Sequence, residues 1–105
     1  MKYHAHIYWK NDKQRNVAIN MRTFLEDAGG ELGRIWDKPI GPHPTSMYQV
    51  KYDDSNKDHI ESYIKNNIGD LSVLLHNDTG NDLEDHTQDV IWLGDPIKLD
   101  LKAFK

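Results

Sequence analysis

The N-terminal segment alternates strictly between apolar and polar side chains. Residues 3–9 read Tyr-His-Ala-His-Ile-Tyr-Trp, and a period of two is typical of a strand with one buried face. The buried face would carry Ala5, Ile7 and Trp9, and the opposite face would carry His4, His6 and Tyr8. Two imidazoles therefore lie on the same side of the predicted strand, away from the core.

Two later segments show helical spacing instead. Apolar residues recur every three or four positions from Val17 to Ala28 and again from Ile60 to Ile68. Polar residues just before each segment can cap its start, and a glycine directly after each segment can end it. We therefore predict two amphipathic helices.

Three further segments are predicted as strands, at residues 31–36, 46–52 and 71–76. The resulting order predicts an α+β fold, a ferredoxin-like βαββαβ sandwich with a four-stranded antiparallel sheet and both helices on one face. The first strand should lie between the third and the fourth. Residues 91–94 form a short apolar run. The remainder of the chain is expected to be a C-terminal extension, as an edge strand or an arm, and residues 1–105 a single domain.

Composition narrows the classes of function. The net charge of −4 and the lack of a long basic run argue against a nucleic-acid partner. The chain has no cysteine, so disulfides, thiolate metal sites and thiol nucleophiles are excluded. No signal peptide or membrane span is expected, and the default expectation is a cytoplasmic protein with no membrane contact.

The predicted topology brings four histidines to one end of the sheet. His4 and His6 begin the first strand, His76 ends its predicted neighbour, and His43 lies in the proline-flanked loop before the third strand. Converging neutral imidazoles suit iron, zinc, copper or nickel. No acidic residue falls on this face of the first or fourth strand, so an all-histidine triad is favoured over two histidines and a carboxylate. Asp85 is the carboxylate that could replace one of them.

We predict His6, His43 and His76 as the metal ligands. His6 lies further inside the sheet than His4, His76 ends the neighbouring strand on the same face, and prolines on both sides restrain His43. His4 and His86 are predicted to lie around the ligands without binding the metal or to act in proton transfer, and His86 could instead contact the substrate or have no role. His86 lies in an acidic stretch, residues 77–89, that is expected to be a solvated loop able to act as a lid.

The predicted substrate contacts are further residues on the face without helices. Polar and aromatic groups there are suited to lining a pocket, and the residues assigned to substrate binding are Tyr8, Arg34 and Gln49. Arg34 could pair with a substrate carboxylate. His59 falls on the charged side of the second helix and is assigned no role.

Several short motifs occur together and in a fixed order: residues 3–9, Gly-Pro-His-Pro at 41–44, Leu-Leu-His at 74–76 with Thr-Gly at 79–80, Asp-His-Thr at 85–87, and Trp-Leu-Gly at 92–94. In these motifs, from Tyr3 to about Leu101, the chain resembles the DOPA 4,5-dioxygenase family. The resemblance implies a ferredoxin-like, non-haem iron(II) enzyme that uses dioxygen for extradiol ring cleavage of a catechol such as L-DOPA.

Two other classes of function stay open. One is a cofactorless monooxygenase, and the other is a non-catalytic ferredoxin-like dimer that binds a metal or small molecule. A homodimer is predicted in any case, because the sheet face without helices carries apolar side chains that a partner or the C-terminal arm should cover. These side chains are Leu32, Trp36, Met47 and Leu74.

Overall fold

The computed structural model describes residues 1–104, with side chains up to residue 102. Its elements are β1 (Lys2–Tyr8), α1 (Asp12–Asn20), α2 (Arg22–Asp27), β2 (Glu31–Leu32), β3 (Met47–Asp53), α3 (Lys57–Asn67), β4 (Ser72–Asn77), α4 (Asp82–Asp85), β5 (Ile91–Leu93) and a 3₁₀ turn at Leu101–Phe104. Within the described residues, no helix combines the length and the apolar character that a membrane span requires.

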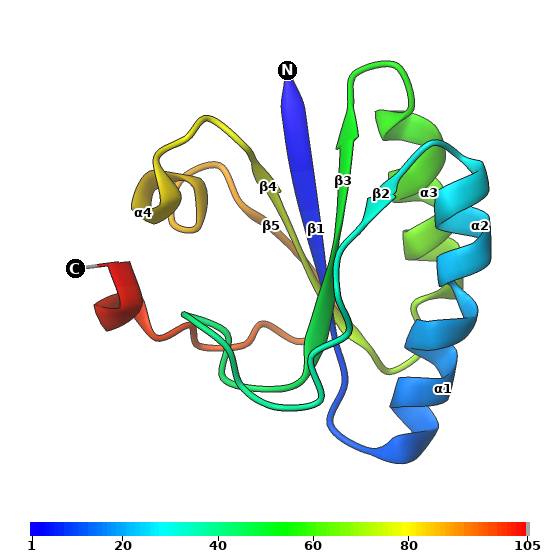
Figure 1. The fold of residues 1–105 in the computed structure, drawn as a ribbon, viewed down its shortest axis with the longest axis horizontal. Helices are drawn as coiled ribbons and strands as arrows, with labels where there is room; N and C mark the ends of the chain where they lie inside the picture. The colour runs from blue at the N-terminus through cyan, green and yellow to red at the C-terminus, as the bar shows by residue number, and fades with distance from the viewer. Residues whose placement is uncertain (105) are drawn as a thin grey trace.

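The strands form a five-stranded antiparallel sheet in the order β2-β3-β1-β4-β5 (Figure 1). The predicted placement of β1 between β3 and β4 is confirmed. The sheet has five strands where four were predicted, because residues 91–93 pair with β4 and extend the sheet at that edge. The fold is therefore α+β, with an open sheet whose central strand carries His4 and His6.

The helices α1, α2 and α3 cover one face of the sheet, and α4 and the C-terminal segment lie on the other side (Figure 1). The main core lies under the three helices and takes its sheet residues from alternate positions of β1, β3 and the segment from Leu71 through β4. These residues are Ala5, Ile7, Trp9, Tyr48, Val50, Tyr52, Leu71, Val73 and Leu75. The predicted division of each strand into a core face and a face without helices is thus confirmed for the three long strands.

The second predicted strand is shorter than expected. Only Glu31 and Leu32 pair with β3 in a ladder, and Trp36 returns to the sheet as an isolated bridge to Met47. Leu32 lies opposite Val50 and packs with it against the helix-side core. Its predicted position on the face without helices is therefore wrong, because the alternation assumed for residues 31–36 does not run through the whole segment.

The first predicted helix is divided in two at Met21. The amide of Met21 donates to the carbonyl of Ala18, three residues back, and α2 begins at Arg22. The Met21 side chain is buried in the main core. After α2, Gly30 passes so close to the core that a Cβ atom there would lie 2.6 Å from a methyl group of Val50. Glycine therefore allows the chain to turn tightly from helix to strand.

A second, smaller core lies on the sheet face without helices. Tyr8, Met47 and Leu74 are buried there, and the residues packed against them are Trp36, Ile40, Val90, Trp92, Ile97 and Leu99. Ile97 and Leu99 from the C-terminal segment of the same chain thus help to cover Met47 and Leu74, two of the four apolar side chains whose exposure was the reason to expect a dimer. The homodimer itself stays a prediction.

Candidate metal centre

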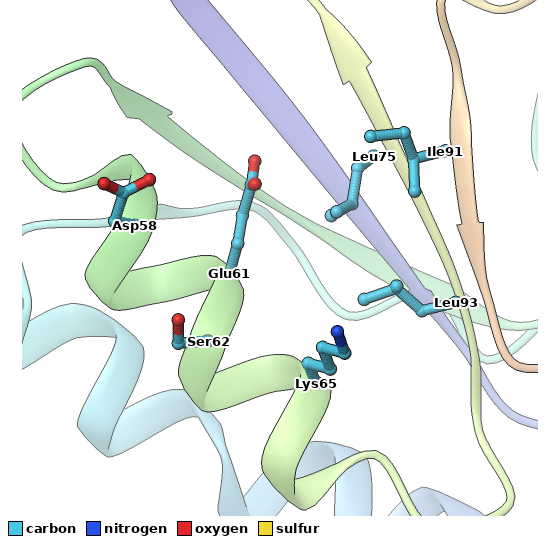
Figure 2. Close-up of a pocket in the computed structure, with 7 residues that line it drawn as sticks. All are labelled: Asp58, Glu61, Ser62, Lys65, Leu75, Ile91 and Leu93. Atoms are coloured by element: carbon cyan, nitrogen blue, oxygen red, sulfur yellow. The ribbon is translucent and has the colours of Figure 1, made fainter.

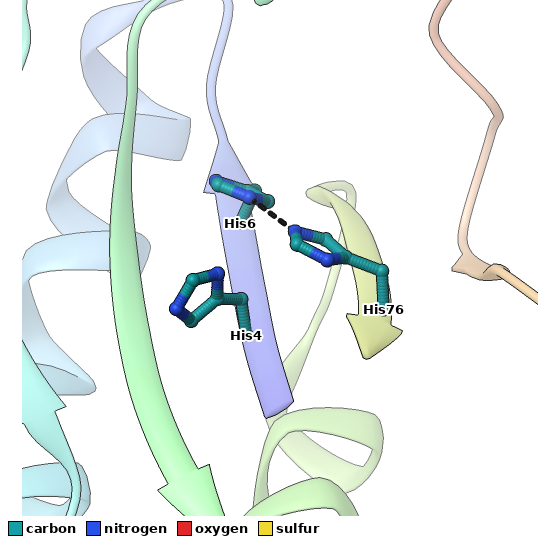
Figure 3. A group of neighbouring side chains, drawn as sticks. All are labelled: His4, His6 and His76. Carbon is teal, nitrogen blue, oxygen red and sulfur yellow. Dashed lines mark hydrogen bonds between the residues drawn. The ribbon is translucent and has the colours of Figure 1, made fainter. Parts of the chain in front are cut away.

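Five histidines gather on the face without helices. His4 and His6 come from β1, His76 comes from β4, and His43 comes from the proline-flanked loop. His86 directly follows α4. The ring centroid of His6 lies 4.3 Å from that of His43, 4.8 Å from that of His76 and 5.4 Å from that of His86. Figure 3 shows His4, His6 and His76 on the same side of the two neighbouring strands. His6 is the centre of the group.

A short contact joins His6 and His76. Their Nε2 atoms lie 2.7 Å apart (Figure 3). Nδ1 of His76 lies 2.7 Å from the carbonyl oxygen of Asn77, to which it must donate. In a neutral His76 ring Nε2 is then the acceptor, so Nε2 of His6 donates to it. This leaves Nδ1 of His6 with a lone pair, and this atom is buried without a hydrogen-bond partner.

Two other rings are oriented by oxygen atoms. Nδ1 of His43 shares a 2.7 Å hydrogen bond with the hydroxyl of Tyr8, which is only 1% exposed. The Tyr8 ring stacks on Trp92, with 5.8 Å between centroids. Nδ1 of His86 lies 2.7 Å from the carbonyl oxygen of Asp82 in α4 and donates to it. Partners of this kind fix which nitrogen of a histidine faces a metal and how the ring is turned.

Burial keeps the imidazoles neutral. Desolvation, reinforced by the neighbouring histidines, lowers the pKa of His43 to about 4 and that of His6 well below its ordinary value. Desolvation also lowers the pKa of His76 to about 4, although the Asn77 carbonyl opposes it. For His4, burial lowers the pKa while Asp78 opposes the shift. Neutral imidazole is the form that binds metals, so these side chains are in the protonation state that a metal ion requires at neutral pH.

The nitrogen atoms fall into two overlapping groups. Those of His4, His6 and His76 lie within 4.8 Å of one another, and so do those of His6, His43 and His86. His6 belongs to both groups, and neither group found among the described residues contains a carboxylate. The predicted ligands His43 and His76 each join His6, but in different groups. The ligand set His6, His43 and His76 stays a prediction.

The residues present fit a first-row transition metal. Their donors are neutral imidazoles, and the buried lone pair of His6 Nδ1 has no hydrogen-bond donor facing it. Leaving such an atom unpaired is costly for a folded protein, and a metal ion would satisfy it. A donor set of this type suits iron, zinc, copper or nickel.

The acidic stretch is more ordered than expected. Instead of a solvated loop throughout, it contains the helical turn α4, whose first amides are capped by Asn81 through a 3.0 Å bond to the amide of Glu84. Asp85 is buried and accepts hydrogen bonds from the amide and the hydroxyl of Thr79, at 2.8 and 2.6 Å. Burial would raise the pKa of Asp85, but these bonds outweigh it and lower the pKa. The hydrogen bonds between Asp85 and Thr79 therefore fix the turn that carries His86.

The predicted substrate residues lie in different surroundings. Gln49 is half-buried and lies opposite His6 in the sheet register. Tyr8 is buried with its hydroxyl bonded to His43, and Arg34 is exposed, with its guanidinium 4.1 Å above the Trp36 ring. Their contacts with a substrate stay predictions. His59 lies on the helix layer beside Phe24, with 5.2 Å between the ring centroids.

Two charged residues beside the histidines were not assigned a role from the sequence. Lys51 lies opposite His4 in the register, and Asp78 directly follows β4. The alternation in the strand at residues 46–52 places Lys51 on the same face as the histidines, and this was the available signal for a role in the site. For Asp78, which lies outside the strands, the sequence pattern offers none.

A separate groove of about 260 Å³ lies on the helix side of the sheet (Figure 2). Leu75, Ile91 and Leu93 from the sheet face Asp58, Glu61, Ser62 and Lys65 from α3. Leu75 and His76 are consecutive residues on opposite faces of β4, so the groove is separated from the histidines by the sheet. It contains no imidazole.

The fold and its histidine cluster define a small α+β protein with a candidate metal site on an open antiparallel sheet. The family model of the Dopa 4,5-dioxygenase family matches residues 3–103. The chain belongs to this family, as the order of its motifs indicated.

Individual relatives agree with this assignment. The chain is 31% identical to an uncharacterized 21.2 kDa protein of Botryotinia fuckeliana, over 97% of this chain and 61% of that protein. It is 30% identical to the DOPA 4,5-dioxygenase of Amanita muscaria, over 95% of this chain and 48% of that enzyme. The chain thus spans only about half to three fifths of these two relatives. The crystal structure of a candidate dioxygenase from Nostoc punctiforme matches with a TM-score of 0.90 and 36% identity, over 97% of this chain and 89% of that one.

Proposed function

We propose that this protein is a non-haem iron(II) extradiol dioxygenase that opens the ring of a catechol such as L-DOPA. The observation that carries the proposal is the cluster of desolvated, neutral histidines around His6 in a member of the Dopa 4,5-dioxygenase family. The rival classes do not account for this cluster as well. A cofactorless monooxygenase has no use for it. A metal-binding module could also use it, but membership of the Dopa 4,5-dioxygenase family favours the enzyme.

His6, His43 and His76 are the proposed iron ligands. The lone pair on His6 Nδ1 and the lowered pKa values of His43 and His76 support this set. The alternatives are the two compact groups, in which His86 or His4 replaces one member. Bound iron(II) would supply the electron transfer that lets dioxygen react with a catechol, a reaction that is slow without a metal.

The remaining parts of the proposal concern what the protein's own groups do. The Tyr8 hydroxyl and the Asn77 carbonyl hold His43 and His76 by Nδ1, so that Nε2 of each ring is directed away from them. His4 and His86 are proposed to move protons, because a catechol must give up its hydroxyl protons as it reacts. Burial lowers the pKa of His4, so this imidazole is neutral and can accept such a proton and pass it on readily.

The protein also limits access of water to the site. The small core formed by Tyr8, Met47 and Leu74 closes one end of the cluster, with the C-terminal segment packed over it. A dry site strengthens every polar interaction inside it. The finer fold assignment is proposed as a ferredoxin-like core of four strands extended by β5, since the strand order β2-β3-β1-β4 is the order expected for that core. The homodimer and the cytoplasmic location stay predictions.

The test is anaerobic loading with iron(II), followed by oxygen-uptake measurements over a panel of catechols. We expect uptake and a yellow ring-opened product. Bound metal without uptake would favour the non-catalytic binding module, and uptake that survives chelation would favour a cofactorless monooxygenase.

The ligand assignment is tested by measuring iron stoichiometry and uptake in single alanine variants of the six histidines. Loss of a ligand should empty the site. Loss of a proton-transfer group should leave iron bound and slow turnover roughly a hundredfold to ten-thousandfold. Full iron in His43→Ala or His76→Ala, or an empty site in His4→Ala, would refute the assignment, and His86→Ala decides whether His86 is a ligand.

A further inference from the structure

A pair of opposite charges lies beside the histidine cluster. The Asp78 carboxylate oxygen Oδ2 lies 3.5 Å from Nζ of Lys51 and 3.4 Å from Nε2 of His4. The His4 ring in turn meets those of His6 and His76 edge-on, with centroids 6.1 and 5.1 Å apart. A cation and an anion are thus separated from the proposed metal ligands by a single imidazole.

The pair is not needed to hold the fold. Both of its contacts are longer than the 2.7–2.9 Å or so of a tight charge-assisted hydrogen bond. By comparison, Nζ of Lys57 lies 2.8 Å from Glu61 on α3. The Lys51 and Asp78 side chains are 34% and 25% exposed, and such a pair stabilises a protein very little. The backbone of Asp78 is already fixed, because its amide donates to the carbonyl of Lys2 at 2.9 Å.

We propose that Lys51 and Asp78 form the subsite that selects the charged tail of the catechol, an inference that rests on the proposed function. Lys51 binds a carboxylate on the tail, and Asp78 binds an ammonium group. Both side chains are partly exposed and lie directly beside His4. A catechol whose ring is held at the histidines and whose side chain is directed past His4 would bring its tail against them. Beyond the proposed function, these two residues are assigned as the groups that would distinguish a tail with both charges, such as that of L-DOPA, from a neutral one.

Other charged groups fit this role less well. The oxygens of Asp85 are occupied by the amide and hydroxyl of Thr79. The guanidinium of Arg34, which the sequence suggested for a carboxylate, lies over the Trp36 ring. The neutral imidazoles carry no charge, so they do not select between an anionic and a cationic tail. Lys51 takes the place expected for Arg34, because it lies directly opposite His4.

The experiment is anaerobic titration calorimetry on the iron(II)-loaded protein with small catechols whose tails differ in charge. The probes are 3,4-dihydroxyphenylacetate with an anionic tail, dopamine with a cationic tail, and 4-methylcatechol with a neutral one. The readout is the affinity ratio of each charged catechol to the neutral one, which cancels any general effect on the iron site. Removing one charge-assisted hydrogen bond typically costs about tenfold to a hundredfold in affinity.

We expect Lys51→Met to lower the ratio for dihydroxyphenylacetate at least about tenfold, and Asp78→Asn to do the same for dopamine. The matched controls are Lys13→Met on α1 and Asp27→Asn on α2, both exposed on the helix side of the sheet, and they should keep both ratios. Unchanged ratios in both test variants would overturn the proposal. So would a loss confined to Arg34→Met.

The outcomes also separate this inference from the proposed function. Oxygen uptake with ratios that do not move means that the tail subsite is wrong and the dioxygenase stands. No uptake with any catechol, but ratios that fall as expected, means that the subsite stands on a protein that binds catechols without cleaving them. If the protein does not bind iron, the affinity ratios are measured by the same titrations on the metal-free protein. If no catechol binds at all, both proposals fail.

Discussion

Metal binding should resist acid far better than an ordinary histidine site does. A proton and a metal ion compete for the same imidazole lone pair, so the pKa of each ligand sets the pH at which metal is lost. Burial lowers the pKa of His43 and of His76 to about 4, and that of His6 well below its ordinary value. These three rings should therefore stay neutral until the pH falls close to 4.

The expected contrast is large. Three exposed histidines with a pKa of about 6.5 would each be about nine-tenths protonated at about pH 5.5, and their joint metal affinity would fall about a thousandfold. With pKa values of about 4, the His43 and His76 rings are each protonated by only a few per cent at that pH. Burial lowers the pKa of His6 as well, so the joint affinity should fall less than about twofold.

Anaerobic equilibrium dialysis against iron(II), repeated from about pH 7.5 down to about pH 4, measures this profile. The affinity should be flat across the upper part of the range and drop only as the pH approaches 4. His59→Ala, which changes an exposed histidine on α3, is the control and should give the same curve. A loss of about a thousandfold by about pH 5.5 would show that the ligand rings are solvated, contrary to the reasoning above.

The same shifts make the metal-free protein acid-labile. The pKa values of His43 and His76 are lower in the folded state than in the unfolded state, so the free energy of unfolding should be full above about pH 6.5. It should fall as the pH drops toward 4, by up to about 3 kcal/mol for each ring. Urea unfolding at several pH values tests this, and a free energy of unfolding independent of pH would contradict it. Tyr8→Phe removes the hydrogen bond to His43 Nδ1, so the affinity for iron should fall about tenfold to a hundredfold, with an unchanged circular dichroism spectrum. If the variant binds iron as tightly as the wild type, Tyr8 does not position His43. Asp85→Asn weakens the hydrogen bonds between Asp85 and Thr79, so amide hydrogen exchange in residues 79–87 should become faster. The control Asp82→Asn should leave the exchange rates unchanged. Equal rates in both variants would mean that these hydrogen bonds do not hold the turn.

Strict alternation made the central part of the fold readable from the sequence. In β1 a slip of one residue would move Ala5 and Ile7 out of the main core and put both histidines into it, so the register is strongly specified. The same reasoning placed His76 beside His4, and the structure pairs these residues directly. The site face could therefore be predicted because its opposite face is so clearly apolar.

The misses have local causes. Leu32 was assigned to the wrong face because alternation was extended through residues 31–36, although the ladder with β3 ends after two residues. The fifth strand has only three residues, too short for a period to emerge. For α4 a signal was available, since Asn81 followed three residues later by Glu84 is a helix-start pattern. Long-range contacts such as Tyr8 with His43 leave no trace in local spacing.

The central claim is that histidines around His6 hold an iron ion that makes this protein a ring-cleaving dioxygenase. The most direct test is to measure bound iron and oxygen uptake with L-DOPA side by side in the wild type, in His6→Ala and in His59→Ala. The wild type and His59→Ala should bind about one iron per chain and consume oxygen, while His6→Ala should lose both, since His6 belongs to both groups of candidate ligands. Iron retained in His6→Ala, or oxygen uptake that continues without iron, would contradict the claim.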